Sequence, residues 1–178
     1  MGSGSSDNKT AGLVYTALMI CLVLLGTVLF RIPVPMTQGY VHLGDAMVFL
    51  GVLMLGKRRG AAAAGLGSAL ADVLGGFAFW APWTLVIKSM MAFVTGLILE
   101  KTARSDNAGQ PAGRLVKLTA MAAGGTVMCA GYLAAETVMY GSFALAVTGL
   151  PWNIGQVAVG IVLSMAVFPV MNLSAGKK

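Results

Sequence analysis

The sequence has few charged residues and very few side chains of the kinds that bind metal ions. Charged residues make up 10% of the 178 residues, whereas about 25% is usual for a soluble domain. There is one histidine, His42, and the two cysteines, Cys21 and Cys129, each stand alone in an apolar run. Isolated cysteines in such runs usually pack as small hydrophobic side chains, and a metal site needs several ligands together. We therefore expect neither a disulfide nor a metal site.

Apolar residues are abundant instead: 57% of the chain is hydrophobic and the mean hydropathy is +0.83. A helix needs about 20 residues to cross a bilayer, and we interpret six apolar segments as helices that cross it. They are Ala11–Phe30, Leu43–Gly56, Ala61–Phe79, Trp83–Leu99, Leu115–Met139 and Pro151–Leu173. The second is short and the third is rich in alanine and glycine, which is tolerated where a helix packs closely on neighbours or lines a cavity. The sequence predicts an all-α membrane protein, a bundle of six transmembrane helices surrounded by lipid.

The basic residues predict the orientation of the chain in the membrane. Most of them lie before the first segment, between the second and third, between the fourth and fifth, and at the C-terminus, whereas only Arg31 lies on the opposite side. Lysine and arginine are enriched in cytoplasmic segments, so both termini are predicted to be cytoplasmic. Topology also accounts for the net charge of +6, and we expect no nucleic-acid partner. Residues 1–9 are predicted to be a tail that begins with a cloning remnant, 10–173 a single membrane domain, and 174–178 a basic tail.

In this topology, polar side chains from several predicted helices fall in the outer half of the membrane. A charge without a partner costs at least about 3 kcal/mol at this depth, so such side chains face the bundle interior and mark a functional site by default. We expect them to shape a ligand-binding pocket together with nearby aromatic residues. The predicted ligand-binding residues are Tyr40, His42, Asp45, Asp72, Trp80, Trp83, Lys88, Tyr132, Glu136, Asn153 and Gln156.

Some of these residues also have a purely structural interpretation. Asp72 and Lys88 could form a buried ion pair that only fixes the register of two helices. His42 could be a polar residue at the start of a helix rather than a proton relay. The tryptophans could belong to an aromatic belt at the membrane surface, or they could stack on a planar ligand.

The run GYVHLGDAMVFLGVLMLGKRRGAAAAGLGSALADVLGGFAFWAPWTLVIKSMM and the later LPWNIGQVAVG resemble the substrate-binding S component of energy-coupling factor (ECF) vitamin transporters. The resemblance is closest to the riboflavin-type group and extends weakly to Thr16–Cys21. It implies a multi-pass protein of the prokaryotic plasma membrane with an outward-facing vitamin site. Such a protein would dock on a transmembrane T subunit that is driven by two cytoplasmic ATPase subunits.

The resemblance also assigns roles outside the pocket. The small-residue AxxxA face by which the first helix of the family meets the T subunit matches Ala17 and Cys21, so cysteine replaces the second alanine. The spacing of small residues, at Gly12 and Thr16 as well as at Ala17 and Cys21, gives this helix a smooth face, which is typical of ordinary helix packing and could also dock another membrane subunit. The family's first outer loop acts as a lid over the site, which corresponds here to Arg31–Tyr40 and includes Gln38.

Together these features predict high-affinity capture of a water-soluble vitamin or vitamin precursor at the extracellular face, followed by delivery across the membrane. The captured vitamin would be a substrate, so no cofactor is expected, and the chain is not expected to be an enzyme. One alternative is a self-sufficient small-molecule transporter. Another is an intramembrane enzyme that uses Asp72 or Glu136 as an acid or base. The residues leave the identity of the vitamin open, although the aromatic side chains favour a planar heterocycle.

Overall fold

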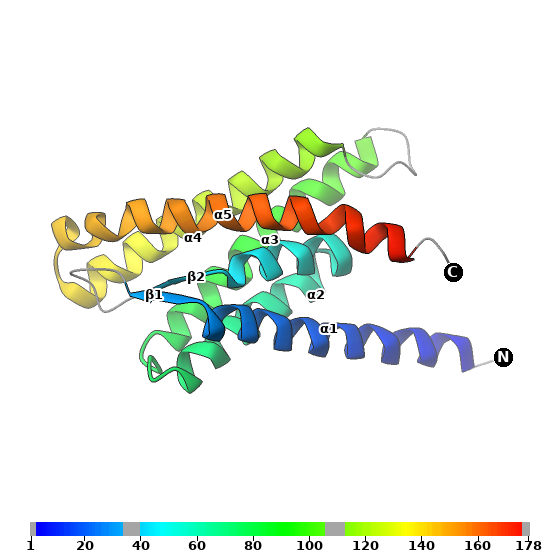
Figure 1. The fold of residues 1–178 in the computed structure, drawn as a ribbon, viewed down its shortest axis with the longest axis horizontal. Helices are drawn as coiled ribbons and strands as arrows, with labels where there is room; N and C mark the ends of the chain where they lie inside the picture. The colour runs from blue at the N-terminus through cyan, green and yellow to red at the C-terminus, as the bar shows by residue number, and fades with distance from the viewer. Residues whose placement is uncertain (1–2, 34–39, 106–112, 176–178) are drawn as a thin grey trace.

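The computed structural model of the chain describes residues 3–33, 40–105 and 113–175 (Figure 1). Helices dominate these residues, and a pair of three-residue strands joins the first helix to the second. The elements are α1 (Ser3–Leu29), β1 (Arg31–Pro33), β2 (Tyr40–His42), α2 (Gly44–Leu74), α3 (Ala81–Ser105), α4 (Arg114–Tyr140) and α5 (Phe143–Ala175). Helix α1 thus includes most of the residues assigned above to an N-terminal tail.

The prediction of a six-helix bundle is wrong. The described residues form five helices, and four of these are long and apolar enough to cross a membrane: Asn8–Leu29, Ala81–Ala103, Arg114–Tyr140 and Phe143–Met171. The predicted spans Leu43–Gly56 and Ala61–Phe79 are instead the two parts of one element, α2. Each part, 44–55 or 57–74, is shorter than the ~20 residues that a full crossing takes, so neither is a spanning helix by length and composition.

The backbone at Gly56 explains this difference. Gly56 has φ 74° and ψ 179°, which is outside the helical region, and glycine adopts positive φ without the steric cost that other residues have. A Cβ added at Gly60 would lie 2.8 Å from Val52 Cα, whereas residues eight apart in a straight helix are separated by about 12 Å. The two parts of α2 therefore fold back on each other at Gly56, and Figure 1 shows α2 running toward the end that holds both termini and returning.

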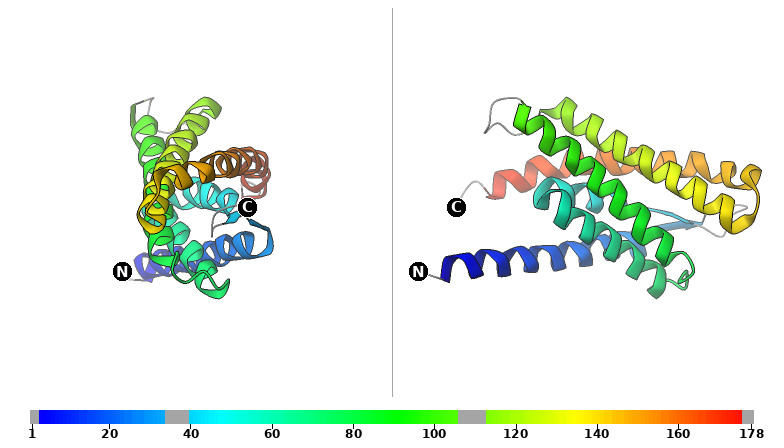
Figure 2. Two further views of the ribbon diagram at one scale, coloured as in Figure 1. Left: turned by 90° about the vertical axis from the view of Figure 1, so that its left-hand side faces the viewer. Right: turned by 180° about the vertical axis from the view of Figure 1, so that it is seen from behind.

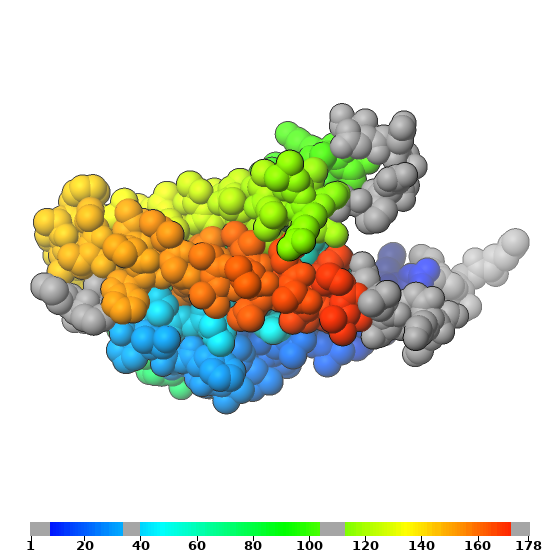
Figure 3. Space-filling model, turned by 45° about the horizontal axis from the view of Figure 1, so that its top comes forward, coloured from blue at the N-terminus to red at the C-terminus, as the bar shows by residue number. Residues whose placement is uncertain are grey.

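Helix α2 lies at the centre of the molecule, where it contacts α1, α3 and α5. Figure 3 shows part of α2 in cyan between α1 in blue and α5 in orange and red. Both views of Figure 2 show α3 and α4 running side by side, as their contacts require. The two parts of α2 are short and contain many buried residues, whereas the outer helices keep apolar faces outside, as the 70% exposure of Leu13 and 66% exposure of Val162 illustrate.

The end of the molecule away from the termini carries the β hairpin. Strands β1 and β2 pair antiparallel, with Arg31 opposite His42 and Pro33 opposite Tyr40. The predicted extended loop Arg31–Tyr40 therefore begins and ends in strands. At the same end, α4 stops at Gly141, which has φ 65°, and α5 begins at Phe143. Pro151, predicted to start the last helix, lies inside α5.

Candidate ligand-binding site

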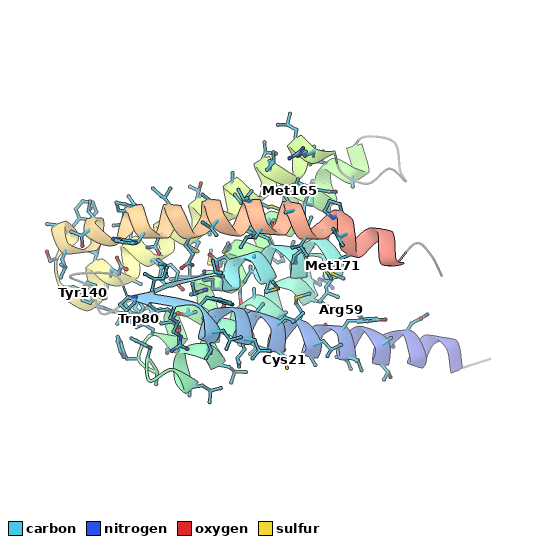
Figure 4. All side chains as sticks on the ribbon, in the orientation of Figure 1. Cys21, Arg59, Trp80, Tyr140, Met165 and Met171 are labelled. Carbon is cyan, nitrogen blue, oxygen red and sulfur yellow. The ribbon has the colours of Figure 1, made fainter. Side chains whose placement is uncertain are left out.

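A cavity with polar and aromatic walls lies between the hairpin and the helices. It contains about 540 Å³ of empty space, a value that includes the part open to the exterior. Figure 4 places Trp80, one of its walls, far from the termini. The lining residues are Thr27, Tyr40, His42, Ser68, Asp72, Trp80, Thr84, Tyr132, Glu136, Gly149, Asn153 and Gln156.

The structure brings eight of the eleven predicted ligand-binding residues into this lining. The three that lie outside it are Asp45, Lys88 and Trp83. Sequence reasoning missed four lining residues: Thr27, Ser68, Thr84 and Gly149. A signal for two of them was present, because Ser68 precedes Asp72 by one helical turn and Thr84 precedes Lys88 by one turn, and residues four apart share a helix face.

Lys88 and Asp45 form an ion pair behind the cavity wall. Lys88 Nζ donates to Asp45 Oδ1, and both side chains are completely buried. Lys88 Nζ also lies 5.6 Å from the centroid of the Tyr132 ring, which places the cation against one wall of the cavity. The alternative pairing considered from the sequence, Asp72 with Lys88, is therefore wrong, because the carboxylate that bonds Lys88 is that of Asp45.

Gln156 connects this ion pair to the hairpin. Its Nε2 donates to Asp45 Oδ2 at 2.8 Å, and its Oε1 accepts the main-chain N–H of His42 at 2.9 Å. One amide thus joins α5, the start of α2 and strand β2. Because both ends of the amide are already bonded within the protein, Gln156 fixes the shape of the cavity as well as lining it.

His42 is held as a neutral side chain. Its Nδ1 accepts the main-chain N–H of Gly44 at 3.0 Å, which requires an unprotonated nitrogen. Burial, followed by the nearby charge of Lys88, lowers the pKa of His42 to about 3. The imidazole therefore remains uncharged at neutral pH, and the prediction of a structural role at the start of the second helix describes its contacts better than a proton relay does.

Tyr40 connects the hairpin to the carboxyl group of Asp72. The Tyr40 hydroxyl donates to Asp72 Oδ1, and the Tyr40 ring lies 4.8 Å from the ring of Phe77. Burial, followed by the charge of Asp72, raises the pKa of Tyr40 far above its usual range. The phenol therefore keeps its proton and acts as a donor to Asp72.

Aromatic rings form the opposite wall. Trp80 is only 4% exposed, and its ring centroid lies 6.2 Å from that of Tyr132 and 6.3 Å from that of Tyr140. Trp83 and Trp152 are 38% and 40% exposed and do not line the cavity. Their positions agree with the aromatic-belt interpretation, whereas Trp80 has the burial and the neighbours of a stacking wall.

Arg31 holds the hairpin against the end of α2. Its guanidinium donates to the carbonyl oxygens of Ala71 at 2.8 Å and Gly75 at 3.4 Å, at the C-terminal end of α2, where the Ala71 oxygen also accepts the main-chain N–H of Gly75. The same guanidinium lies 4.8 Å from the centroid of the Tyr40 ring. Arg31, predicted as part of a lid, thus has a defined position at the rim, while Gln38 lies outside the described residues.

The four residues predicted to contact a T subunit divide into two pairs on α1. Gly12 is buried, and a Cβ there would lie 2.2 Å from the guanidinium of Arg59. Thr16 is partly buried and its hydroxyl donates to the Gly12 carbonyl oxygen at 2.7 Å. Ala17 and Cys21 are exposed on the outside of the helix. Within this chain, only the second pair presents a free surface.

Comparisons with known proteins agree with this architecture. Residues 7–172 match the family described as ECF-type riboflavin transporter, S component. The chain is 30% identical over 145 residues to the thiamine precursor transporter HmpT of Lactococcus lactis subsp. cremoris. This alignment covers 81% of this chain and 77% of that protein. It is 40% identical over 115 residues to an uncharacterized protein of Pyrococcus woesei, which covers 65% of this chain and 71% of the relative.

A solved structure, reported as the structure and mechanism of the S component of a bacterial ECF transporter, has the same fold. The two chains superpose with a TM-score of 0.67 at 14% identity, over 93% of this chain and 98% of the other. The resemblance noted from the sequence is thereby confirmed. The chain belongs to the ECF-type riboflavin transporter S component family, and its function is that of an ECF S component, the capture of a vitamin or vitamin precursor for transport.

Proposed function

We propose that the chain captures a planar heterocyclic vitamin or vitamin precursor in the cavity beneath the β hairpin, at the extracellular face of the prokaryotic plasma membrane. The observation that carries the proposal is the composition of the cavity walls. Trp80 and Tyr132 offer aromatic faces, while Asp72, Glu136 and Asn153 offer polar groups. Small-molecule sites combine a mostly apolar or aromatic surface with a few polar groups that fix the orientation of the ligand.

The residues of the site divide into ligand contacts and positioning residues. We assign the ligand contacts to Tyr40, His42, Asp72, Trp80, Tyr132, Glu136 and Asn153. Asp45 and Lys88 are completely buried in their ion pair, so they would shape the site without touching the ligand. Gln156 would transmit the position of α5 to the hairpin through its two bonds. The relative described as a thiamine precursor transporter supports a small heterocycle as the ligand.

Delivery into the cell would depend on partners of the ECF complex, a transmembrane T subunit and two cytoplasmic ATPases. Ala17 and Cys21 are small and exposed on α1, and small residues allow two helices in a membrane to approach closely. We therefore place the T-subunit contact on this part of α1. The ligand would leave chemically unchanged, so the proposal includes neither a catalytic step nor a cofactor.

The test begins with the purified protein in detergent. Denaturation followed by mass spectrometry identifies any small molecule that co-purifies, and titration with riboflavin, pyridoxine and a hydroxymethylpyrimidine measures binding by tryptophan fluorescence. A ligand that stacks near Trp80 should quench fluorescence in the native protein and in Trp152→Phe, but much less in Trp80→Phe. Failure to bind any vitamin or precursor would overturn the proposal. Uptake by this chain alone in vesicles without ATPases would favour a self-sufficient transporter instead.

A further inference from the structure

Among the described residues, the cavity lining contains two acidic side chains and neither lysine nor arginine. Asp72 and Glu136 line it and are only 4% and 6% exposed, respectively. None of the described lining residues is a lysine or an arginine. The third buried acid, Asp45, is already paired with Lys88 outside the lining. The acidic groups that face the cavity are therefore not balanced by a cation within it.

The nearby cationic groups are engaged elsewhere. The Arg31 guanidinium bonds the carbonyl oxygens of Ala71 and Gly75 and lies over the Tyr40 ring. Lys88 bonds Asp45, and its Nζ lies 5.6 Å from the centroid of the Tyr132 ring. His42 Nδ1 accepts a hydrogen bond from Gly44, which a protonated Nδ1 could not do. None of these groups makes a described bond to Asp72 or Glu136.

Unsatisfied hydrogen-bond acceptors gather in the same cavity. Among the described residues, the buried side-chain atoms without a hydrogen-bond partner are Ser68 Oγ, Asp72 Oδ2 and Glu136 Oε2, and all three residues line the cavity. Buried polar groups are nearly always bonded to protein, water or ligand. Two of the three atoms are carboxylate oxygens, which water or a bound molecule that offers hydrogen-bond donors would satisfy, while the Ser68 hydroxyl can donate or accept.

Glu136 lies where two helices pack closely together. Its carboxylate, on α4, packs against Gly149 of α5, where an added Cβ would lie 2.7 Å from Glu136 Oε2. A glycine at this position leaves room for the carboxylate between the two helices. A buried acceptor that is left unpaired is costly, so a site that contains one discriminates strongly between ligands that have the matching donor and those that lack it.

We infer that the cavity selects ligands that present hydrogen-bond donors and carry no negative charge, with Glu136 as a specificity-determining residue. The inference rests on the proposed function and narrows it to uncharged or cationic planar heterocycles that bear amino or hydroxyl groups. A carboxylate or phosphate on the ligand would face Asp72 and Glu136, would find no lysine or arginine among the lining residues to bond it, and would leave the two acceptor atoms unpaired.

A panel of vitamins tests the charge selectivity. Riboflavin, pyridoxine, pyridoxamine and a 4-amino-5-hydroxymethylpyrimidine are uncharged or cationic donors, whereas pantothenate, biotin and nicotinate are anions at pH 7.5. Isothermal titration of the purified chain should find binding to at least one member of the first set and to none of the second. Binding of an anion in the cavity would overturn the charge inference while leaving vitamin capture intact. Binding of no compound at all would overturn vitamin capture itself and the inference with it.

The two glutamates of the chain provide a matched pair of variants. Glu136→Gln removes one negative charge from the cavity with almost no change in shape, whereas Glu100→Gln makes the same chemical change at the Lys57 ion pair, outside the cavity. Loss of a hydrogen bond to a charged group corresponds to roughly a 10- to 100-fold loss of affinity. We expect this loss for Glu136→Gln and less than about a twofold change for Glu100→Gln.

Asp72→Asn serves as an independent variant, and size-exclusion chromatography and thermal unfolding show whether each variant is folded. A folded Glu136→Gln protein and a folded Asp72→Asn protein that both retain native affinity would refute the inference. A loss of affinity as large in Glu100→Gln as in Glu136→Gln would do the same, because the effect would then not come from the cavity.

Discussion

Replacing Lys88 by methionine should destabilise the protein more than any other single change of a basic residue that the structure describes. Lys88 and Asp45 are both completely buried, so the substitution leaves the Asp45 carboxylate in an apolar region without its cation. Breaking a buried pair by removing one partner costs about 3–5 kcal/mol. Gln156 Nε2 still donates to Asp45 Oδ2, and this remaining bond to a charged group favours a value near ~3 kcal/mol.

The double substitution Asp45→Asn/Lys88→Met removes both charges together. Replacing both members of a buried ion pair by uncharged residues of similar volume is often neutral. Asparagine retains an oxygen that can accept the Gln156 amide, so the network with α5 is kept. The double variant should therefore recover most of the loss of the single variant, which gives a coupling free energy of at least about 2 kcal/mol.

The cycle consists of the unsubstituted protein, the single variants Asp45→Asn and Lys88→Met, and the double variant. Circular dichroism measures the free energy of unfolding of each, by reversible unfolding in mixed detergent micelles. Lys117→Met is the control: Lys117 lies 4.5 Å from the Phe168 ring centroid and outside the buried network, so the loss should stay below about 1 kcal/mol. If Lys88→Met loses no more than this control, or if the double variant is as unstable as the single one, the assignment of a charged buried pair is wrong.

Three further predictions concern the backbone, the histidine and the rim. Gly56→Ala should destabilise by about 1–2 kcal/mol because φ 74° is strained for alanine, while Gly155→Ala, in open space on a helix, should be neutral or stabilising in the same unfolding assay. The pKa of His42 is lowered to about 3 in the native protein, so the unfolded chain binds the proton at a higher pH than the native protein does. Stability should therefore fall as pH drops from 6.5 toward 3, by about 2 kcal/mol at pH 5. His42→Gln should abolish this slope, and an unchanged slope would assign it to other groups. Tyr40→Phe removes the donor to Asp72 and should weaken ligand binding about tenfold, which titration of a folded variant measures; unchanged affinity would exclude Tyr40 from the site.

The convergence of polar residues could be predicted because charged side chains are costly in a membrane wherever they are not enclosed by protein. That argument identified Asp72, Glu136 and Tyr132 without any knowledge of the fold, and all three line one cavity. It could not identify Ser68 or Thr27 as easily, because a hydroxyl group in a transmembrane helix can bond its own backbone, as Thr27 does with the carbonyl oxygen of Val23. Small hydroxyl side chains therefore carry little positional information in the sequence.

The partner of Lys88 depends on three-dimensional structure in a way that residue types do not reveal. Asp45 and Asp72 are the same residue type on the same element, and both lie near the predicted outer face. The fold-back of α2 at Gly56 places both carboxylates beside α3, and the packing of α5 distinguishes them. A Cβ added at Gly160 of α5 would lie 3.0 Å from Asp45 Cβ, and Gln156 of the same helix bonds the Asp45 carboxylate. Asp72 is thus left to the cavity, where it bonds Tyr40.

The same bend explains why counting apolar segments gave the wrong number of helices. A hydropathy pattern records two apolar stretches separated by Lys57, Arg58 and Arg59, and it treats each as an independent crossing. In the structure the two stretches form one element, α2, in which Gly56 is the residue with non-helical backbone angles. Because the two short parts are enclosed by α1, α3 and α5, they can carry Asp45, Ser68 and Asp72 at buried positions that a lipid-facing helix could not hold. The fold-back of α2 thus brings Ser68 and Asp72 to the cavity, while the helices long enough to span a membrane supply other polar lining residues, such as Glu136.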